Sequence, residues 1–431
     1  MRLNWFSPLP PARNGVAEWA GHVLPAVCRR ADVVLWTDQA ARQLPPGVTA
    51  EVRHFQPGAL PWAEVQRADL SVYHVGNNAA CHAGIWQVSR RHPGVVVLHD
   101  LCLPHLFIDH FRQRNDFAGY REEMERFYGD TGGWLAPRVW DHRVPPDYLS
   151  DRCPHTELAV EGALGVLVHS PAAYEALRPA MRWPLAYQPL AYRLTRPAAP
   201  AAKGGEPYRL IVFGHIGTNR CLDSVLEALA RFRDGGRFHL HVCGPLWDEN
   251  HVKGRVKALD LRRCVTLHGY VGDRDLDAAL AASHLAINLR NPTMGEASLS
   301  QLRLWDHALP ALVSRTGWYA TLSPTAVAHV DPGAEVEDLC RYLEAFLRDP
   351  ASFAGMGVEG RTWLEQYHAP DLYADGLLRL CEEAKAYRPR AVSYYLAGRA
   401  AAEMSAWAGR HAEALSEQVA GPIVGLTAGP A

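Results

Sequence analysis

Residues 284–323 read HLAINLRNPTMGEASLSQLRLWDHALPALVSRTGWYATLS and contain the clearest structural pattern of the chain. The apolar run 285–289 predicts a buried strand, and the polar loop after it leads into an amphipathic helix that Pro310 ends. A second apolar run, 311–314, predicts the next strand. Strand, loop, helix and strand in this order form the repeating unit of a parallel α/β sheet. Ligands of such sheets bind where strands end, and the free amides and dipole of a helix N-terminus suit a diphosphate.

Glu296 lies close to the start of that helix, directly after Gly295. A carboxylate in the first turn stabilises a helix by a few tenths to about 1 kcal/mol, because it offsets the positive end of the helix dipole. The local pattern by itself therefore favours a structural role for Glu296. A role in binding is the alternative, because a ligand of the sheet would lie at the same position.

Residues 288–298, NLRNPTMGEAS, resemble the donor-binding segment of retaining GT-B glycosyltransferases, the family 4 (group 1) type. The residues that the resemblance places at the donor are Gly295, Glu296, Ala297, Ser298 and Leu299. It implies that Glu296 binds hydroxyl groups of the donor sugar and that the next three backbone amides bind its diphosphate. Many members carry a second acid eight residues after the first, for the ribose. That position is Leu304 here, so ribose recognition has no assigned residue.

The bulk composition is that of a globular protein with more than one domain. The 431 residues exceed one ordinary core, and 48% hydrophobic with 21% charged residues is typical of globular chains. A net charge of −2 without a basic block argues against nucleic-acid binding. The nine cysteines are scattered without a C-x-x-C pair, which favours reduced thiols and a cytoplasmic location.

The sequence also bears on metals and membranes. No H-E-x-x-H spacing occurs, and no Asp-x-Asp pair directly follows a predicted strand, so we expect no metal site and no cofactor. The N-terminus lacks an apolar core of signal-peptide length, and no run reaches the roughly 20 apolar residues of a membrane span. Peripheral contact with a membrane is left open, as is the oligomeric state.

The N-terminal half contains several short apolar runs of the kind found in open parallel sheets. They predict strands at 3–6, 33–36, 70–75, 95–98 and 165–168. A Pro-rich loop after the first strand ends in Asn14 and Gly15, and a helical pattern runs on from Ala17. Asn-Gly is typical of a tight turn, but a glycine there would also let the backbone approach a ligand phosphate. The family has a Gly-containing loop at this place, facing donor and acceptor.

Polar residues follow two of these strands. His99 and Asp100 come after one strand and Asn77 after another. The resemblance gives His99 a role beside the donor sugar, mostly in binding, and we place Asn77 and Asp100 at the acceptor. Turn formation is the alternative for the last two. Residues 107–157, rich in charged and aromatic side chains, predict a helical insertion that would select the acceptor, although a solvated pair of charged helices is the commoner explanation of such composition.

Residues 193–207 include RPAAPAAKGGEP, which predicts an interdomain linker. A second set of strands follows at 209–213, 238–243, 265–268, 285–289 and 311–314. Two such halves indicate the GT-B architecture: two Rossmann-like, doubly wound parallel-sheet domains facing a central cleft. The boundaries that we predict are 1–192 for the N-terminal acceptor-side domain, 193–207 for the linker, 208–370 for the C-terminal nucleotide-sugar domain, 371–388 for a helix crossing back to the first domain, and 389–431 for an Ala-rich tail without assigned function.

The loop 214–220, which follows the first strand of the second half, is a second chemical feature. Arg220 falls where the family has a lysine that neutralises the donor diphosphate, and a guanidinium can bind phosphate in the same way. The alternative is an exposed residue at the start of a helix, which is slightly disfavoured because a cation there opposes the helix dipole. The arginine that often starts this loop is His215, which leaves one fixed cation instead of two. The other donor residues predicted here are Gly217, Thr218 and Asn219. After the third strand, Tyr270 and Val271 would meet the nucleotide base, although a simple turn is nearly as well supported.

The function predicted from the sequence is retaining, metal-independent transfer of a sugar from a nucleoside diphosphate donor of the UDP or GDP type. The acceptor would be a small molecule, glycan, lipid or peptide. The residues assigned to catalysis are Glu296, His99 and Arg220. Alternatives are a GT-B epimerase or phosphorylase, a catalytically silent partner protein on the same fold, and a Rossmann oxidoreductase. The last is disfavoured because Gly214-x-x-Gly217 lacks G-x-G-x-x-G spacing.

Overall fold

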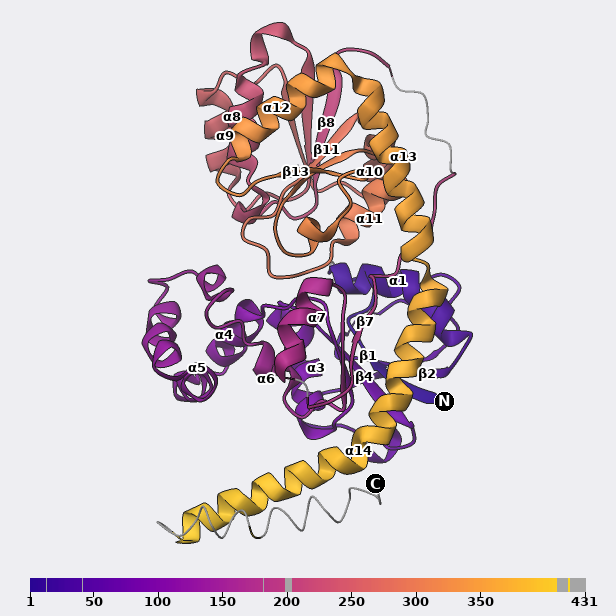
Figure 1. The fold of residues 1–431 in the computed structure, drawn as a ribbon, viewed down its shortest axis with the longest axis vertical. Coiled ribbons are helices and arrows are strands. Elements are labelled where there is room, and N and C mark those ends of the chain that lie inside the picture. The colour runs from indigo at the N-terminus through magenta and orange to yellow at the C-terminus, as the bar shows by residue number, and fades with distance from the viewer. Residues whose placement is uncertain (13, 41, 181, 198–203, 409–417, 419–431) are drawn as a thin grey trace. The chain divides into compact units, whose positions relative to one another are not determined.

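The computed structural model describes residues 1–12, 14–40, 42–180, 182–197, 204–408 and 418. They divide into two compact α/β units (Figure 1). The first unit comprises residues 1–169 and 173–188 and the chain from Ala374 onward, and the second comprises 170–172 and 189–373. Part of the predicted linker, residues 198–203, and most of the tail, residues 409–417 and 419–431, lie outside the described residues.

The first unit is built on a seven-stranded sheet in the order β3-β2-β1-β4-β5-β6-β7, with every neighbouring pair parallel. Its strands are β1 (Arg2–Phe6), β2 (Asp32–Thr37), β3 (Glu51–His54), β4 (Leu70–Val75), β5 (Val95–Leu98), β6 (Gly165–Val168) and β7 (Leu185–Tyr187). Every residue of β4, β5 and β6 is buried, and β5 and β6 have the continuous apolar sequences expected of such strands. The edge strands β3 and β7 were not predicted, because they are short and only partly buried.

Helices surround this sheet. They are α1 (Gly15–Cys28), α2 (Trp62–Val65), α3 (Ala79–Arg91), α4 (Pro104–Gln113), α5 (Phe117–Trp140), α6 (Thr156–Val160) and α7 (Pro171–Leu177). The predicted helical insertion corresponds to α4 and α5, which lie to one side of the sheet and share a core with it through Phe107 and Met124 (Figure 1). The last helix, α14 (Pro370–Ala408), packs Leu380 and Ala384 close to Gly165 of β6.

The second unit has a six-stranded parallel sheet in the order β10-β9-β8-β11-β12-β13. Its strands are β8 (Tyr208–Phe213), β9 (Phe238–Cys243), β10 (Val265–Gly269), β11 (Leu285–Asn288), β12 (Ala311–Ser314) and β13 (Ala328–Val330). Its helices are α8 (Leu222–Ala230), α9 (Glu249–Ala258), α10 (Asp273–Ala282), α11 (Leu299–Asp306), α12 (Glu335–Arg348) and α13 (Pro350–Tyr367). Helices α8 and α9 lie on one side of the sheet and α10, α11 and α13 on the other (Figure 1).

In each sheet, the direction in which successive strands are added reverses once, between β1 and β4 in the first sheet and between β8 and β11 in the second. The chain winds from β1 to β3 on one side and then restarts next to β1 with β4, and in the second unit it winds from β8 to β10 and restarts next to β8 with β11. Ligands of doubly wound sheets bind at the carboxyl ends of the strands where such a reversal occurs. We therefore expect ligands at the carboxyl ends of β1 and β4 and of β8 and β11.

A buried ion pair between Arg361 and Asp306 contacts the start of the predicted linker, residues 193–207. Arg361 on α13 donates to Asp306 of α11 over 2.7 Å, and Asp306 also accepts from the Thr195 hydroxyl over 2.5 Å. Asp306 is almost completely buried, so this carboxylate is compensated by several donors rather than by water. Elsewhere, none of the described helices is both long and apolar enough to cross a lipid bilayer.

Candidate functional site

A backbone hydrogen bond connects the loop after β8 to the loop after β11. The loop after β8 reaches Arg220, the loop after β11 reaches Ser298, and the Asn291 amide donates to the Asn219 carbonyl over 2.8 Å. The neighbouring β9 loop also comes very close, because a Cβ on Gly244 would lie 1.8 Å from the carbonyl oxygen of Gly214. Glycine is therefore required at Gly244, whose φ of +147° also suits no other residue.

Arg220 ends a short 3-10 turn, η3 (Thr218–Arg220), and its side chain is buried rather than exposed at the start of a helix. Its Nη1 donates to Asn288 Oδ1 over 2.7 Å, while its Nε has no hydrogen-bond partner among the described residues. Burial, followed by repulsion from Arg290, lowers the pKa of Arg220 to about 9. The group still carries its charge at neutral pH, and no carboxylate among the described residues forms an ion pair with it.

Glu296 is held inside its own loop. Its Oε1 accepts from Arg290 Nε over 3.1 Å, and its Oε2 accepts from the Thr293 hydroxyl and the Met294 amide, each over 2.8 Å. Gly295, with φ +77°, turns the backbone so that the carboxylate can reach back to these donors. The side chains of Glu296 and Arg290 are each less than one-fifth exposed. These three contacts hold the Glu296 carboxylate within its own loop, and its role in binding the donor stays a prediction.

Arg290 is the residue that sequence reasoning missed. It follows the carboxyl end of β11 and lies close enough to Arg220 for the two guanidinium groups to repel each other. A second guanidinium therefore stands beside Arg220, and it comes from the loop after β11 and not from the loop 214–220. Its place within the 288–298 motif, directly after a strand, is the signal that could have identified it.

The start of α11 offers backbone donors next to these charges. Ser298 is the N-cap and its Oγ accepts from the Gln301 amide over 3.1 Å, whereas the amides of Ala297, Ser298 and Leu299 make no hydrogen bond to the described residues. Tyr319, from the 3-10 turn η5 (Gly317–Thr321), is buried beneath them, close to Arg290 and Glu296. Burial raises the pKa of Tyr319, so its hydroxyl stays protonated.

The remaining predicted donor residues lie along the same edge of the sheet. Gly217 and Thr218 belong to the β8 loop that holds Arg220. Tyr270 and Val271 follow β10, two strands away from β8, which corresponds to about 10 Å at the usual strand spacing. The Tyr270 side chain is 61% exposed. Leu304 is fully buried, so α11 offers no polar group there for a ribose.

In the first unit, Asn14 and Gly15 lie at the β1/β4 reversal. Asn14 caps α1, with its Oδ1 accepting from the Val16 amide over 2.7 Å, and the helix begins at Gly15, two residues earlier than predicted, because of that cap. Asn77 and Asp100 connect neighbouring loops. The backbone amide of Asn77 donates to Asp100 Oδ2 over 2.7 Å, and the side-chain Oδ1 of Asn77 accepts from the backbone amide of Leu106 over 3.0 Å.

His99 lies in a group of rings at the carboxyl ends of neighbouring strands. Its Nε2 is 3.0 Å from Nδ1 of His74, and its ring contacts those of Trp19 and His169. Burial, followed by the charges that His169 and His74 would carry, lowers the pKa of His99, so its imidazole is neutral at pH 7. His99 is only partly buried, whereas His74 and His169 are buried.

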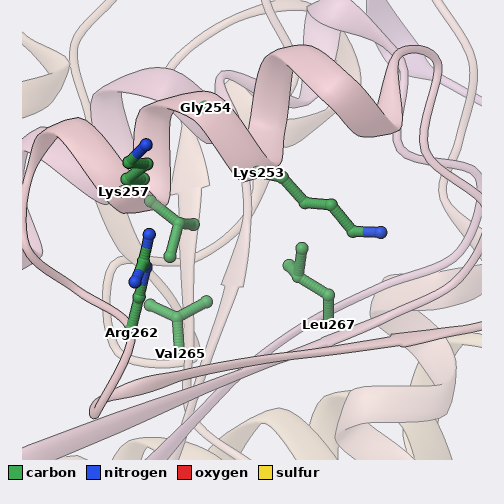
Figure 2. Close-up of a pocket in the computed structure, with 7 residues that line it drawn as sticks. Lys253, Gly254, Lys257, Arg262, Val265 and Leu267 are labelled. Carbon is green, nitrogen blue, oxygen red and sulfur yellow. The ribbon is translucent and has the colours of Figure 1, made fainter.

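A separate pocket of about 460 Å³ lies between α9 and the edge strand β10 (Figure 2). Lys253, Lys257 and Arg262 surround an apolar floor that includes Val265 and Leu267. No predicted donor or acceptor residue lines it. Within the described part of the chain, no three His, Cys, Asp or Glu side chains are grouped so that they could hold a metal ion.

Several solved structures share this architecture. A sucrose-phosphate synthase from Thermosynechococcus elongatus matches with a TM-score of 0.61 at 14% identity, over 89% of this chain and 99% of that chain. Anabaena HepE in complex with UDP matches with a TM-score of 0.59 at 14% identity, over 88% and 99%. WaaG, a glycosyltransferase involved in lipopolysaccharide biosynthesis, gives 0.54 at 14% identity, over 86% and 98%.

No protein-family model matches this sequence, and no curated protein is detectably similar to it. At such low identity, likeness to solved structures shows the fold alone. Together with the two doubly wound parallel sheets, it shows that the chain has the GT-B fold, and that prediction is confirmed.

Proposed function

We propose that this protein is a glycosyltransferase that moves a sugar from a nucleoside diphosphate donor to an acceptor, with retention of anomeric configuration and without a metal. The observation that carries the proposal is the imbalance of charge at the β8/β11 reversal. Arg220 and Arg290 are two neighbouring, largely buried cations, and Glu296 is the carboxylate that pairs with one of them.

A buried cation without a carboxylate partner is costly, and a bound anion would compensate it. The unbonded Nε of Arg220 and the free amides at residues 297–299 supply donors beside that charge. A diphosphate suits such a group of donors, because guanidinium and helix N-terminal amides both bind phosphate oxygens well. Tyr270 and Val271, roughly 10 Å farther along the sheet edge, are at a distance that a nucleoside could bridge.

The chemistry follows from that placement. Breaking the anomeric C–O bond leaves positive charge on the sugar ring and negative charge on the diphosphate, and donors placed where charge develops favour the step. Arg220, Arg290 and the amides would stabilise the leaving diphosphate. Glu296 would then orient the sugar hydroxyls once a donor is bound, and His99 would contribute a further polar contact.

The base is proposed as uracil or guanine. HepE, one of the structurally similar proteins, is known with UDP, with UDP and glucose, and with UDP-glucose, which supports the uracil option. The acceptor is proposed to be a small molecule, glycan, lipid or peptide. Cytoplasmic location remains an expectation from the cysteine content.

A second candidate is a catalytically silent partner protein that binds the nucleotide without turnover. The engagement of Glu296 by Arg290, Thr293 and Met294 favours it, because that carboxylate would have to exchange partners to reach a sugar. An epimerase or phosphorylase on the same fold is the third candidate.

Ligand-dependent thermal stability tests the nucleotide site that the transferase and the silent partner would share. The full chain should be stabilised by UDP or GDP, and a ligand at about 100 times its Kd adds roughly 2.7 kcal/mol to the free energy of unfolding. ADP, dTDP and the nicotinamide dinucleotides serve as comparisons. Hydrolysis of the matching sugar nucleotide would then distinguish a transferase from a silent partner. Stabilisation by none of the nucleoside diphosphates would contradict the proposal.

A further inference from the structure

Four histidines come together at one edge of the first sheet. His74 lies near the carboxyl end of β4, His99 follows β5, His169 follows β6, and His82 lies on α3. The ring of Trp5 packs against His74 with centroids 4.1 Å apart, and the ring of Trp19 lies 4.9 to 5.6 Å from those of His74, His99 and His169. Adjacent parallel strands bring these rings together, because their carboxyl ends meet at the same edge.

Two of the histidines have tautomers that their backbone partners determine. His82 Nδ1 lies 2.9 Å from the carbonyl oxygen of His74, and His169 Nδ1 lies 3.1 Å from that of Gln188. A carbonyl only accepts hydrogen bonds, so each Nδ1 carries the proton. The Nε2 of His82 is then an acceptor, in agreement with the amide nitrogen of Asn14 that faces it at 3.5 Å.

The His74–His99 contact joins two nitrogens that share one proton. Nδ1 of His74 lies 3.0 Å from Nε2 of His99, so one of the two must donate. The other nitrogen of His74, Nε2, is buried and has no hydrogen-bond partner among the described residues. A buried N–H without an acceptor is rarer and less favourable than a buried acceptor without a donor. The proton of His74 therefore belongs on Nδ1, and His74 donates.

His99 is consequently the acceptor of this bond through Nε2. Burial lowers the pKa of both imidazoles, so each keeps a single proton at neutral pH. The proton of His99 must then be on Nδ1. That nitrogen makes no hydrogen bond to the described residues, and His99 is partly exposed, so its N–H is available to a ligand.

We infer that His74 is a positioning residue that holds His99 as the neutral Nδ1–H tautomer, so that His99 presents a hydrogen-bond donor to an oxygen atom of the ligand. This inference rests on the proposed function, in which that oxygen is a sugar or acceptor hydroxyl. It also limits the chemistry of His99: a nitrogen that already carries a proton cannot remove one from an acceptor hydroxyl. His99 acts in binding and orientation and not as a general base.

Nuclear magnetic resonance of the ¹⁵N-histidine-labelled full chain tests the tautomers without any need for activity. His74 and His99 should both show a protonated Nδ1 and an unprotonated Nε2 at pH 7.5, with the signals assigned by single His-to-Asn variants. A protonated Nε2 on His99 would overturn the inference. Because this measurement needs no substrate, it decides the inference even if no nucleotide binds, whereas nucleotide binding and sugar-nucleotide hydrolysis test the proposed function separately.

A pair of substitutions tests the consequence for transfer. In His74→Asn the side-chain amide nitrogen lies where Nδ1 lies and can donate to His99, whereas in His74→Gln it lies nearer to Nε2. We expect His74→Gln to lower kcat by up to about tenfold, the usual effect of one neutral hydrogen bond, and His74→Asn to restore most of the loss. Thermal unfolding of both variants monitors folding. Equal kcat values for two folded variants would contradict a positioning role, as would a variant difference with the His99 tautomer unchanged.

Discussion

The guanidinium of Arg220 donates to the amide oxygen of Asn288 over 2.7 Å, and both side chains are buried. This contact links the loop after β8 to the end of β11, two neighbouring strands of the sheet that are about 70 residues apart in the sequence. An amide oxygen orients a cation but leaves its charge uncompensated. The hydrogen bond to Asn288 therefore orients the Arg220 guanidinium and leaves its charge available to an anion.

Arg220→Ala should weaken binding of the nucleoside diphosphate by about 10-fold to 100-fold, the effect of one charge-assisted hydrogen bond. Binding of the corresponding nucleoside should change little, because it has no phosphate. Isothermal titration calorimetry measures both. Arg262→Ala in the pocket of Figure 2 is the matched control, since it removes an arginine from the same unit outside the site. Equal losses for nucleoside and diphosphate, or a larger loss in the control, would contradict the assignment.

Arg290 and Glu296 should be energetically coupled. Arg290→Ala removes a cation from the diphosphate site but also leaves Glu296 with one partner fewer. If Arg290 only neutralises Glu296, the double variant Arg290→Ala/Glu296→Gln should bind UDP or GDP as tightly as the unmodified protein. If Arg290 contacts phosphate, the double variant should remain about 10-fold weaker. We expect the second result in a double-mutant cycle of Kd values.

Glu296→Gln should reduce sugar transfer by about 100-fold or more while leaving diphosphate affinity nearly unchanged, because the carboxylate is proposed to act on the sugar. Initial rates at saturating donor provide the measurement. Glu344→Gln, on an exposed position of α12, removes a carboxylate of the same kind outside the site and should have no effect. Unchanged transfer by Glu296→Gln would reject its assigned role.

Stability should fall as the pH drops from about 6.5 toward 4. Burial lowers the pKa of His82 and His169 to about 4, below the value of about 6.5 in an unfolded chain. Within this window the unfolded state binds protons that the folded state does not, so the stability present above pH 6.5 is lost as pH falls, by up to about 1.4 kcal/mol per pH unit for each histidine. Urea unfolding at several pH values tests this expectation. His82→Asn should show a shallower loss, and identical slopes would contradict it.

Chelation should leave transfer nearly unchanged. No group of metal-ligating side chains occurs among the described residues, and the two guanidinium groups can take the place that a divalent cation has in other diphosphate sites. Rates measured with and without EDTA test the prediction. A strict requirement for Mg²⁺ or Mn²⁺ would refute it.

Much of the fold could be predicted from the sequence, because buried parallel strands are continuous apolar runs. Interior strands such as β5 and β12 consist almost wholly of apolar residues and have this pattern. The strands β3, β7 and β13 were missed because none of them is a continuous apolar run of four residues: β3 and β7 are only partly buried, and β13 has three residues with a histidine at its centre. Candidate residues such as Arg220 and Glu296 were assigned from the resemblance to the family, and they lie on loops after strands, where ligands of such sheets bind.

The sequence by itself determined which loops would lie at the carboxyl ends of parallel strands, because apolar periodicity and helix-start signals are local properties. Only the tertiary structure decided which side chains of those loops meet. The proximity of Arg290 to Arg220, the partners of Glu296 and the bond from His74 to His99 all depend on strand order, in which each sheet's fourth strand pairs with its first. Strand order is set by packing across the whole sheet, and no local stretch of residues encodes it.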